Sequence, residues 1–233
     1  MATRRAPQLT SRRQPQQLRS TDLVAVILQA ADQVLISAGA QRFTTARVAE
    51  RAGVSVGSVY QYFPNKAAIL FRLQSDEWTR TAETLCAILT DSAQSSDARL
   101  RAWVHAFVAS ECEEAAVRAA LSDVAPRYRE TPGSGQSRES IGQALETFMA
   151  GVLPHAAAAT RTQTGELIRS TLNAAGKQFS MTPRTPDQIR DYADALFEMF
   201  RAYLHDMRAR NVVDANAGHA RQGDGAKRSE EGA

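Results

Sequence analysis

The chain has 233 residues, enough for one domain or for a small head with a larger body, and its 43% hydrophobic content can build a proper core. No apolar run approaches the roughly 20 residues that span a bilayer, and the first 20 residues lack the apolar centre of a signal peptide, so we expect a cytoplasmic protein with no membrane partner. The net charge is +3, but residues 1–66 hold nine Lys or Arg against three Asp or Glu, a distribution expected when only one end of a protein meets nucleic acid.

Residues 1–19 are rich in Arg, Gln, Pro and Ser and have little to bury, so we interpret them as a disordered basic arm. The arginines of such an arm can follow DNA phosphates or enter a minor groove. A solvated tail without a role is an equally good interpretation.

A helix is expected from Ser20 or Thr21 to about residue 38, because apolar residues recur there at spacings of three and four before Gly39. Residues 43–70, FTTARVAERAGVSVGSVYQYFPNKAAIL, then predict two short helices and the start of a third. Thr44 can cap the first of these, over residues 45–52, and Gly53 can end it in the left-handed conformation.

Ser55 can cap the second short helix, from residue 56 to about 63. A three-residue linker that begins with glycine lets two helices cross at the roughly 90–120° of a helix-turn-helix. The outer side of the second helix carries no acidic residue and suits contact with phosphates and base edges. Residues 20–66 are therefore predicted to form a three-helix, DNA-binding head.

The remainder predicts a helical body over residues 67–210. Helical patterns run from residue 66 to about 89, over 97–114, 115–122 and 141–153, from 164 or 165 to 179, and from 186 to about 210. Residues 125–140 are interpreted as a loop or a broken helix, and residues 211–233 as a disordered tail. The fold class is all-α, with about nine helices and no convincing strand.

Signals of catalysis are lacking. The four histidines are scattered, Cys86 and Cys112 have no companion ligands, and no nucleophile, phosphate-loop or paired-carboxylate pattern stands out. We therefore expect no enzymatic activity, no cofactor and no metal site, and we interpret the cysteines as buried thiols.

The head resembles the TetR family of bacterial transcriptional regulators. The family's amino-terminal signature stands here as AGVS at residues 52–55, YQYF at residues 60–63, and Lys66. A bare helix-turn-helix is common, whereas this combination is far more specific. The motif-level resemblance covers about residues 20–75.

The resemblance implies DNA-contacting positions in the head. Tyr60, Tyr62, Thr45 and Lys66 are the phosphate candidates, and Gln61 can bond bidentately to adenine. The position that often carries a base-reading basic residue is Ala46 here, so Arg47 is assigned to a phosphate or to an ion pair with Glu50. The full predicted DNA-binding set is Thr44, Thr45, Arg47, Ser55, Val56, Gly57, Ser58, Tyr60, Gln61, Tyr62 and Lys66.

In the body, aromatic residues at helical spacing are either plain core or the lining of a ligand cavity, which the resemblance implies is apolar with few polar anchors. The candidates are Trp78, Trp103, Phe107 and Phe148. His105, Arg118 and Arg127 are weaker candidates for polar anchors.

The last two helices either close the monomer core or pair with a second copy in a four-helix bundle, as the resemblance implies. The predicted dimer residues are Leu167, Ile168, Leu172, Leu196, Phe197, Phe200 and Leu204. A two-fold dimer presents two recognition helices to successive major grooves, so the operator should be a near palindrome of double-stranded DNA.

The resulting hypothesis is a homodimeric repressor that a small, largely apolar effector releases from its operator. Activation of transcription is an open alternative. A ligand-independent architectural DNA-binding protein and a helical ligand carrier or enzyme are two further alternatives, which DNA-binding specificity and its ligand dependence would separate.

Overall fold

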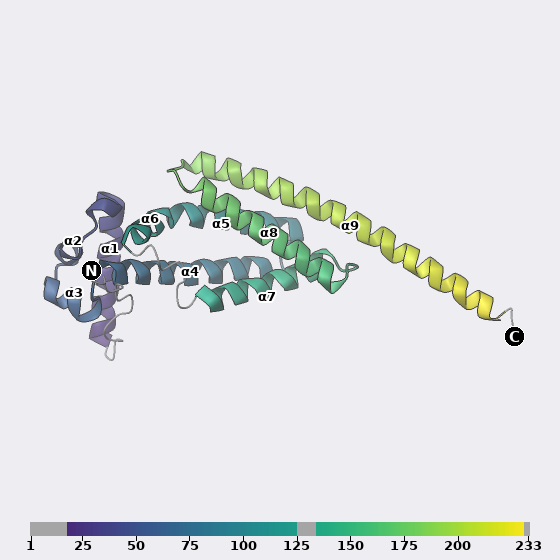
Figure 1. Cartoon of the computed structure of the whole chain (residues 1–233), viewed down its shortest axis with the longest axis horizontal. Coiled ribbons are helices and arrows are strands. Elements are labelled where there is room, and N and C mark those ends of the chain that lie inside the picture. Colours follow the sequence, from purple (N-terminus) through teal and green to yellow (C-terminus); the bar gives the residue numbers. More distant parts are fainter. Residues whose placement is uncertain (1–17, 125–133, 231–233) are drawn as a thin grey trace, which may run out of the picture. The chain divides into compact units, whose positions relative to one another are not determined.

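The computed structural model describes residues 18–124 and 134–230, and within these ranges it contains nine α-helices, one short 3-10 helix and no strand (Figure 1). The predicted all-α fold class is confirmed. In chain order the elements are α1 (Leu18–Ala38), η1 (Ala40–Arg42), α2 (Thr45–Ala52), α3 (Val56–Tyr62), α4 (Lys66–Thr90), α5 (Ser96–Glu113), α6 (Ala115–Val124), α7 (Ser134–Val152), α8 (Ala158–Phe179) and α9 (Pro186–Glu230).

The chain divides into two compact units. Unit 1 comprises Met1–Ala82 and Glu113–Arg138, and unit 2 comprises Glu83–Cys112 and Glu139–Ala233. This division differs from the predicted boundary at residue 66, because the first part of α4 and the whole of α6 group with the amino-terminal helices. The predicted basic arm falls almost entirely outside the described residues.

The core of unit 1 explains this grouping. Ala120 and Leu121 of α6 are buried in the same apolar cluster as Ile27 of α1 and Val59 of α3. Full burial of a large aliphatic or aromatic side chain stabilises a fold by about 1.5–3 kcal/mol. The head therefore has a core that includes α6 as well as α1 to α3 and the start of α4.

One stretch of α1, Thr21–Ala38, is long and apolar enough by length and composition to cross a membrane. This stretch was not predicted, because Gln29, Asp32 and Gln33 interrupt the apolar run. Ile27 and Ala31 of this stretch are fully buried in the core of unit 1. The core that these residues fill accounts for the apolar composition of the helix.

Unit 2 contains the carboxy-terminal part of α4, nearly all of α5, most of α7, and the whole of α8 and α9. Its core is a second apolar cluster, to which these five helices contribute. Close helix contacts help to form it: a Cβ on Gly176 of α8 would lie 2.9 Å from the Phe107 ring of α5, so only glycine lets these helices approach so closely. Tyr192 of α9 stacks on Phe179 of α8 with ring centroids 4.0 Å apart.

Three boundaries differ from the predicted ones. α7 begins at Ser134 rather than near 141, and α8 begins at Ala158 rather than near 164. α9 continues to Glu230, through the segment predicted to be a disordered tail. Residues 211–230 contain no proline, and nine of the 20 are the good helix formers Ala, Arg, Gln, Lys or Glu. The segment also holds three glycines, each of which weakens a helix by about 1 kcal/mol without ending it.

Candidate nucleic-acid interface

Two capped helices form the helix-turn-helix. The Thr44 Oγ1 atom accepts a hydrogen bond from the Arg47 N–H at 3.3 Å, at the start of α2. The Ser55 Oγ atom accepts one from the Ser58 N–H at 3.0 Å, at the start of α3. Both predicted N-caps are thus confirmed, and each satisfies an N–H group that a helix leaves without an intrahelical partner.

Gly53 makes the turn between them. Its φ of 67° and ψ of 29° lie in the left-handed region, and its N–H donates to the Glu50 carbonyl at 3.1 Å. The next N–H, of Val54, reaches back to the Ala49 carbonyl at 3.0 Å. The turn therefore ends α2 with its last carbonyls satisfied, as predicted from the glycine.

The inner side of α3 packs on the core of unit 1. Val59 and Phe63 are 0% and 1% exposed and belong to that core. After α3, the Asn65 Oδ1 atom accepts a hydrogen bond from the Ala68 N–H at 3.0 Å and caps α4. This cap was not predicted, although an Asn directly before a helical pattern is a usable signal.

Most of the predicted DNA-binding residues lie on the outer side of the head. The exposed members are Thr44, Arg47, Ser55, Val56, Gly57, Tyr60 and Gln61, and the half-buried members are Ser58, Tyr62 and Lys66. The structure therefore brings together on α3 a solvent-facing surface that has no acidic side chain.

Thr45 differs from its prediction as a phosphate contact, because its side chain is only 7% exposed. It shares the inner face of α2 with Val48 and Ala49, three and four residues on, which are also buried. The side chain therefore faces the core. What Thr45 still offers to a phosphate is its backbone N–H, in the first turn of α2.

The arginines of α2 divide into two kinds. Arg47 is exposed, and within the described residues it forms no ion pair with Glu50, so the phosphate assignment is the one that stays a prediction. Arg51 instead donates from Nε to Gln33 Oε1 of α1 at 2.7 Å. This contact ties α2 to α1 across 18 residues of sequence, and no local pattern could have revealed it.

The four aromatic residues predicted to line a pocket lie in different places. Trp103 and Phe148 are buried in the core of unit 2, Phe107 packs against that core, and Trp78 belongs to unit 1. A cleft of about 280 Å³ in unit 2 includes none of them. Its lining is Gly151, Val152, Leu153, Pro154, His155, Arg208 and Asn211.

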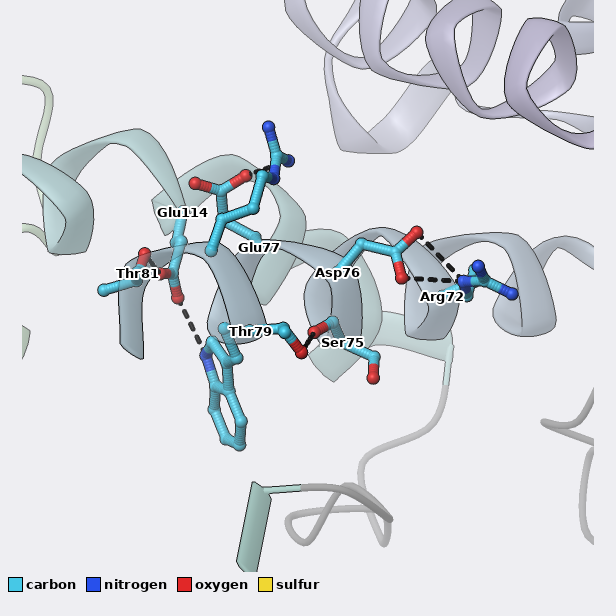
Figure 2. Close-up of polar contacts among 9 residues, drawn as sticks. Arg72, Ser75, Asp76, Glu77, Thr79, Thr81 and Glu114 are labelled. Atoms are coloured by element: carbon cyan, nitrogen blue, oxygen red, sulfur yellow. Dashed lines mark hydrogen bonds and ion pairs between the residues drawn. The ribbon is translucent and has the colours of Figure 1, made fainter. Parts of the chain in front are cut away.

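Trp78 forms a polar contact that the sequence did not suggest. Its indole Nε1 donates to the Glu114 carboxylate at 2.8 Å, and the Thr81 hydroxyl donates to the same carboxylate at 3.4 Å (Figure 2). Glu114 directly precedes α6 and is only 5% exposed. The Arg138 guanidinium lies 5.8 Å from the centre of the Trp78 ring.

The candidate polar anchor His105 already has a hydrogen-bond partner. The His105 Nε2 and Asp194 Oδ1 atoms of unit 2 are 2.9 Å apart, and Arg101 donates to the same oxygen at 2.7 Å. The hydrogen bond with His105, followed by the charges of Arg101 and His105, lowers the pKa of Asp194 below its ordinary value. Arg127 lies outside the described residues.

Cys86 and Cys112 are free cysteines, and both are half-buried. Burial raises the pKa of the Cys86 thiol, so this cysteine is a poor nucleophile at neutral pH. Among the residues that the structure describes, no three His, Cys, Asp or Glu side chains are placed to hold a metal ion.

Six of the seven predicted dimer residues are buried inside unit 2. Leu167 is 50% exposed, whereas the other six are at most 8% exposed and belong to the apolar core of the single chain. In the described part of the chain, the large apolar side chains that α8, α9 and their connection leave exposed are Leu167, Met181 and Met199. The apolar stripes read from the sequence are thus largely the inner faces of α8 and α9.

Comparisons with known proteins match both parts of the chain. The family model "Bacterial regulatory proteins, tetR family" matches residues 27–73, and the model "Tetracyclin repressor-like, C-terminal domain" matches residues 95–207. Among curated proteins, the nucleoid occlusion factor SlmA of Alteromonas mediterranea is 44% identical over 50 residues, which are 22% of this chain and 26% of SlmA. The chain therefore matches about a quarter of the length of this relative.

Solved structures match over most of the chain. A TetR-family regulator from Mesorhizobium loti has a TM-score of 0.58 at 18% identity, covering 80% of this chain and 98% of that one. The regulator SCO0520 of Streptomyces coelicolor has a TM-score of 0.50 at 25% identity, with coverages of 79% and 98%. FadR of Bacillus subtilis, solved in complex with stearoyl-CoA, has a TM-score of 0.53 at 15% identity, with coverages of 76% and 96%.

Proposed function

The chain belongs to the TetR family of bacterial transcriptional regulators, and we propose on that basis that it is a homodimeric repressor that a small molecule releases from its operator. DNA binding through the helix-turn-helix is the shared property of the family. The role as a repressor, the dimer, the palindromic operator and the effector are the parts that this proposal adds.

The observation that carries the proposal is the outer side of α3. Val56, Gly57, Tyr60 and Gln61 face solvent without an acidic neighbour on that helix, while the caps at Ser55 and Gly53 hold its orientation. Such a surface can enter a major groove, where amide and methyl groups distinguish base pairs. Arg47 and Lys66 then supply charge to phosphates beside the groove.

A second copy is proposed because one head of this size reads only one half-site. Two-fold pairing puts two recognition helices one helical turn of DNA apart, which favours a near-palindromic operator. The buried positions of Ile168 and Leu172 argue that pairing uses the outer faces of α8 and α9. Leu167 and Met199 are the exposed apolar side chains that those faces offer.

An effector is proposed because a repressor needs a signal for release. A ligand shifts the equilibrium between two shapes only by its difference in affinity for them. Release therefore requires that the effector binds best to a shape whose two heads mismatch the half-sites. FadR of Bacillus subtilis, with its bound stearoyl-CoA, is a structural relative in which a small ligand occupies this fold. We place the protein in the cytoplasm, where its DNA lies, and we assign it no enzymatic activity.

The test is a titration of the purified protein against the DNA that flanks its own coding region, with excess nonspecific competitor and at two salt concentrations. Sequence-specific binding should survive the competitor, protect a near palindrome and weaken as salt rises. Gln61→Ala should weaken binding and relax the base preference at one position of each half-site. Loss of all binding under competitor, together with the absence of any preferred site in a genome-wide selection, would refute the regulator assignment.

A ligand-independent architectural DNA-binding protein gives a different result in the same assay. Its affinity would show little sequence preference and would not change with any small molecule. A ligand carrier or enzyme would show no sequence-specific binding, and reversal of the charge at Lys66 would leave its activity unchanged.

A further inference from the structure

We propose that a polar face of α4 in unit 1, formed by Gln74, Trp78 and Thr81 together with Glu114, binds an organic cation with N–H donors, such as a protonated amine attached to an apolar or aromatic body. This inference rests on the proposed function, because it names the chemical class of the effector. It also replaces the expectation of a largely apolar effector with that of an amphipathic cation.

The three α4 residues share one face of the helix. Gln74, Trp78 and Thr81 are spaced at i, i+4 and i+7, a spacing that brings side chains onto one side. They follow the stretch from Ala67 to Phe71, which is buried in the apolar core of unit 1. The polar face therefore belongs to the middle of α4 and follows an apolar first part.

Glu114 supplies a negative charge to this face. Its carboxylate accepts hydrogen bonds from Trp78 and Thr81, and the Thr81 bond is long at 3.4 Å (Figure 2). The Glu114 carbonyl accepts the first hydrogen bond of α6, from the Arg118 N–H at 2.9 Å, so the carboxylate lies at the positive end of that helix. Glu114 also takes part in a further polar contact. Its carboxylate oxygens together offer about four acceptor positions, so it can exchange the weak Thr81 bond for a stronger donor.

Gln74 offers an amide to this face. Its side chain is only 8% exposed, and it makes no side-chain hydrogen bond to the described residues. Its amide is not among the fully buried polar atoms that lack a partner, so the amide still reaches solvent. A ligand at this face can therefore donate a hydrogen bond to the Gln74 amide oxygen.

The Trp78 ring is already a platform for a cation. The guanidinium of Arg138 lies over it at 5.8 Å, within the distance at which a cation is attracted to an indole face. Arg138 itself is an exposed side chain, so it can move into solvent and free the ring. A carboxylate, an amide oxygen and an aromatic face in one place select a cationic N–H donor over a neutral or anionic ligand.

Occupation of this face would act on the head. α6 follows Glu114 directly, and its Ala120 and Leu121 lie in the same core as α1 and α3. A ligand that draws Glu114 away from Thr81 changes the position of α6 against α4 within unit 1. The expected regulatory result is a weaker affinity for the operator.

The test uses three probes of matched shape: 4-phenylbutylamine, 4-phenylbutan-1-ol and 4-phenylbutanoate, which are cationic, neutral and anionic at pH 7. Binding to the full-length protein is measured by calorimetry and by the fluorescence of Trp78 in a Trp103→Phe background, since the chain has two tryptophans. Glu114→Gln removes the charge with little change in shape. Glu113→Gln is the matched control, because Glu113 is the exposed neighbour.

We expect the amine to bind at least about 10-fold more tightly than the alcohol, with the carboxylate weakest, because a charge-assisted hydrogen bond is stronger than a neutral one. Glu114→Gln should remove this preference and Glu113→Gln should keep it. The inference is overturned if the wild-type protein binds the alcohol or the carboxylate as tightly as the amine, or if the amine does not bind to protein that circular dichroism shows to be folded. It is also overturned if a folded Glu114→Gln variant keeps the preference. Operator binding by the same wild-type sample, without probe, tests the proposed function separately.

Discussion

Replacement of Gly57 by alanine should stabilise the fold and weaken DNA binding at the same time. Gly57 lies in α3 with a negative φ, and an added Cβ would meet only the Ser55 Oγ atom, at 3.7 Å, which is an ordinary contact. Alanine in place of glycine inside a helix stabilises it by about 0.5–1 kcal/mol. For a chain of this size, that raises the melting temperature by about 1–4 °C.

The same methyl group should hinder DNA binding if α3 enters the major groove. Extra volume in a packed contact costs about 1–3 kcal/mol, so the operator affinity should fall by about 5- to 150-fold. The assay pairs thermal unfolding with an operator titration at fixed salt. Gly142→Ala, in α7 of unit 2, is the matched control: its Cβ would meet nothing within 4 Å, so it should stabilise without changing the affinity. If Gly57→Ala is more stable and binds the operator as tightly as the wild type, then Gly57 does not approach DNA and the placement of α3 is wrong.

Three further substitutions test separate parts of the structure. Gly53→Ala should destabilise the protein by about 1–2 kcal/mol in chemical denaturation. Residue 53 has a φ of 67°, and the added Cβ would have no neighbour within 4 Å, so backbone strain is the whole effect. Unchanged stability would contradict this account. Lys66→Ala should reduce the slope of log affinity against log salt by about 0.9 for each protomer, and an unchanged slope would remove Lys66 from the phosphate contacts. The pKa of Asp194 is lowered in the folded protein, so the ionised carboxylate stabilises the fold above the ordinary Asp value of 3.8, and this stabilisation is lost as the pH falls through the lowered pKa. Asp194→Asn should lack this acid-dependent part of the stability. Identical acid transitions of the variant and the wild type by circular dichroism would argue against the contact with His105.

Local signals predicted the head well, and long-range contacts could not be predicted. The caps at Thr44 and Ser55 depend on residues three positions away, and the left-handed turn depends on Gly53 alone. The contact between Trp78 and Glu114 spans 36 residues, and nothing local marks Glu114 as buried.

Two assignments show how a sequence pattern can be ambiguous. Thr45 is predicted to contact a phosphate, although its spacing to Val48 and Ala49 places its side chain on the inner face of α2. The apolar stripes of α8 and α9 are predicted either to close the monomer core or to pair with a second copy. A stripe that packs on the chain's own helices has the same periodicity as one that packs on a second copy, so only the structure distinguishes Ile168, in the core, from Leu167, on the surface.

The two sides of α3 are under different physical constraints. Val59 and Phe63 are buried, and removal of a large buried side chain such as Phe costs about 3–5 kcal/mol, so the inner side can change little. Val56 and Gln61 are exposed, and substitutions at such positions usually change stability by less than about 0.5 kcal/mol. The base preference of this protein can therefore change while its fold does not. Under the proposed function, we therefore expect the few exposed residues of α3 to determine the operator, and relatives with the same fold and different residues at 56 and 61 to bind different half-sites.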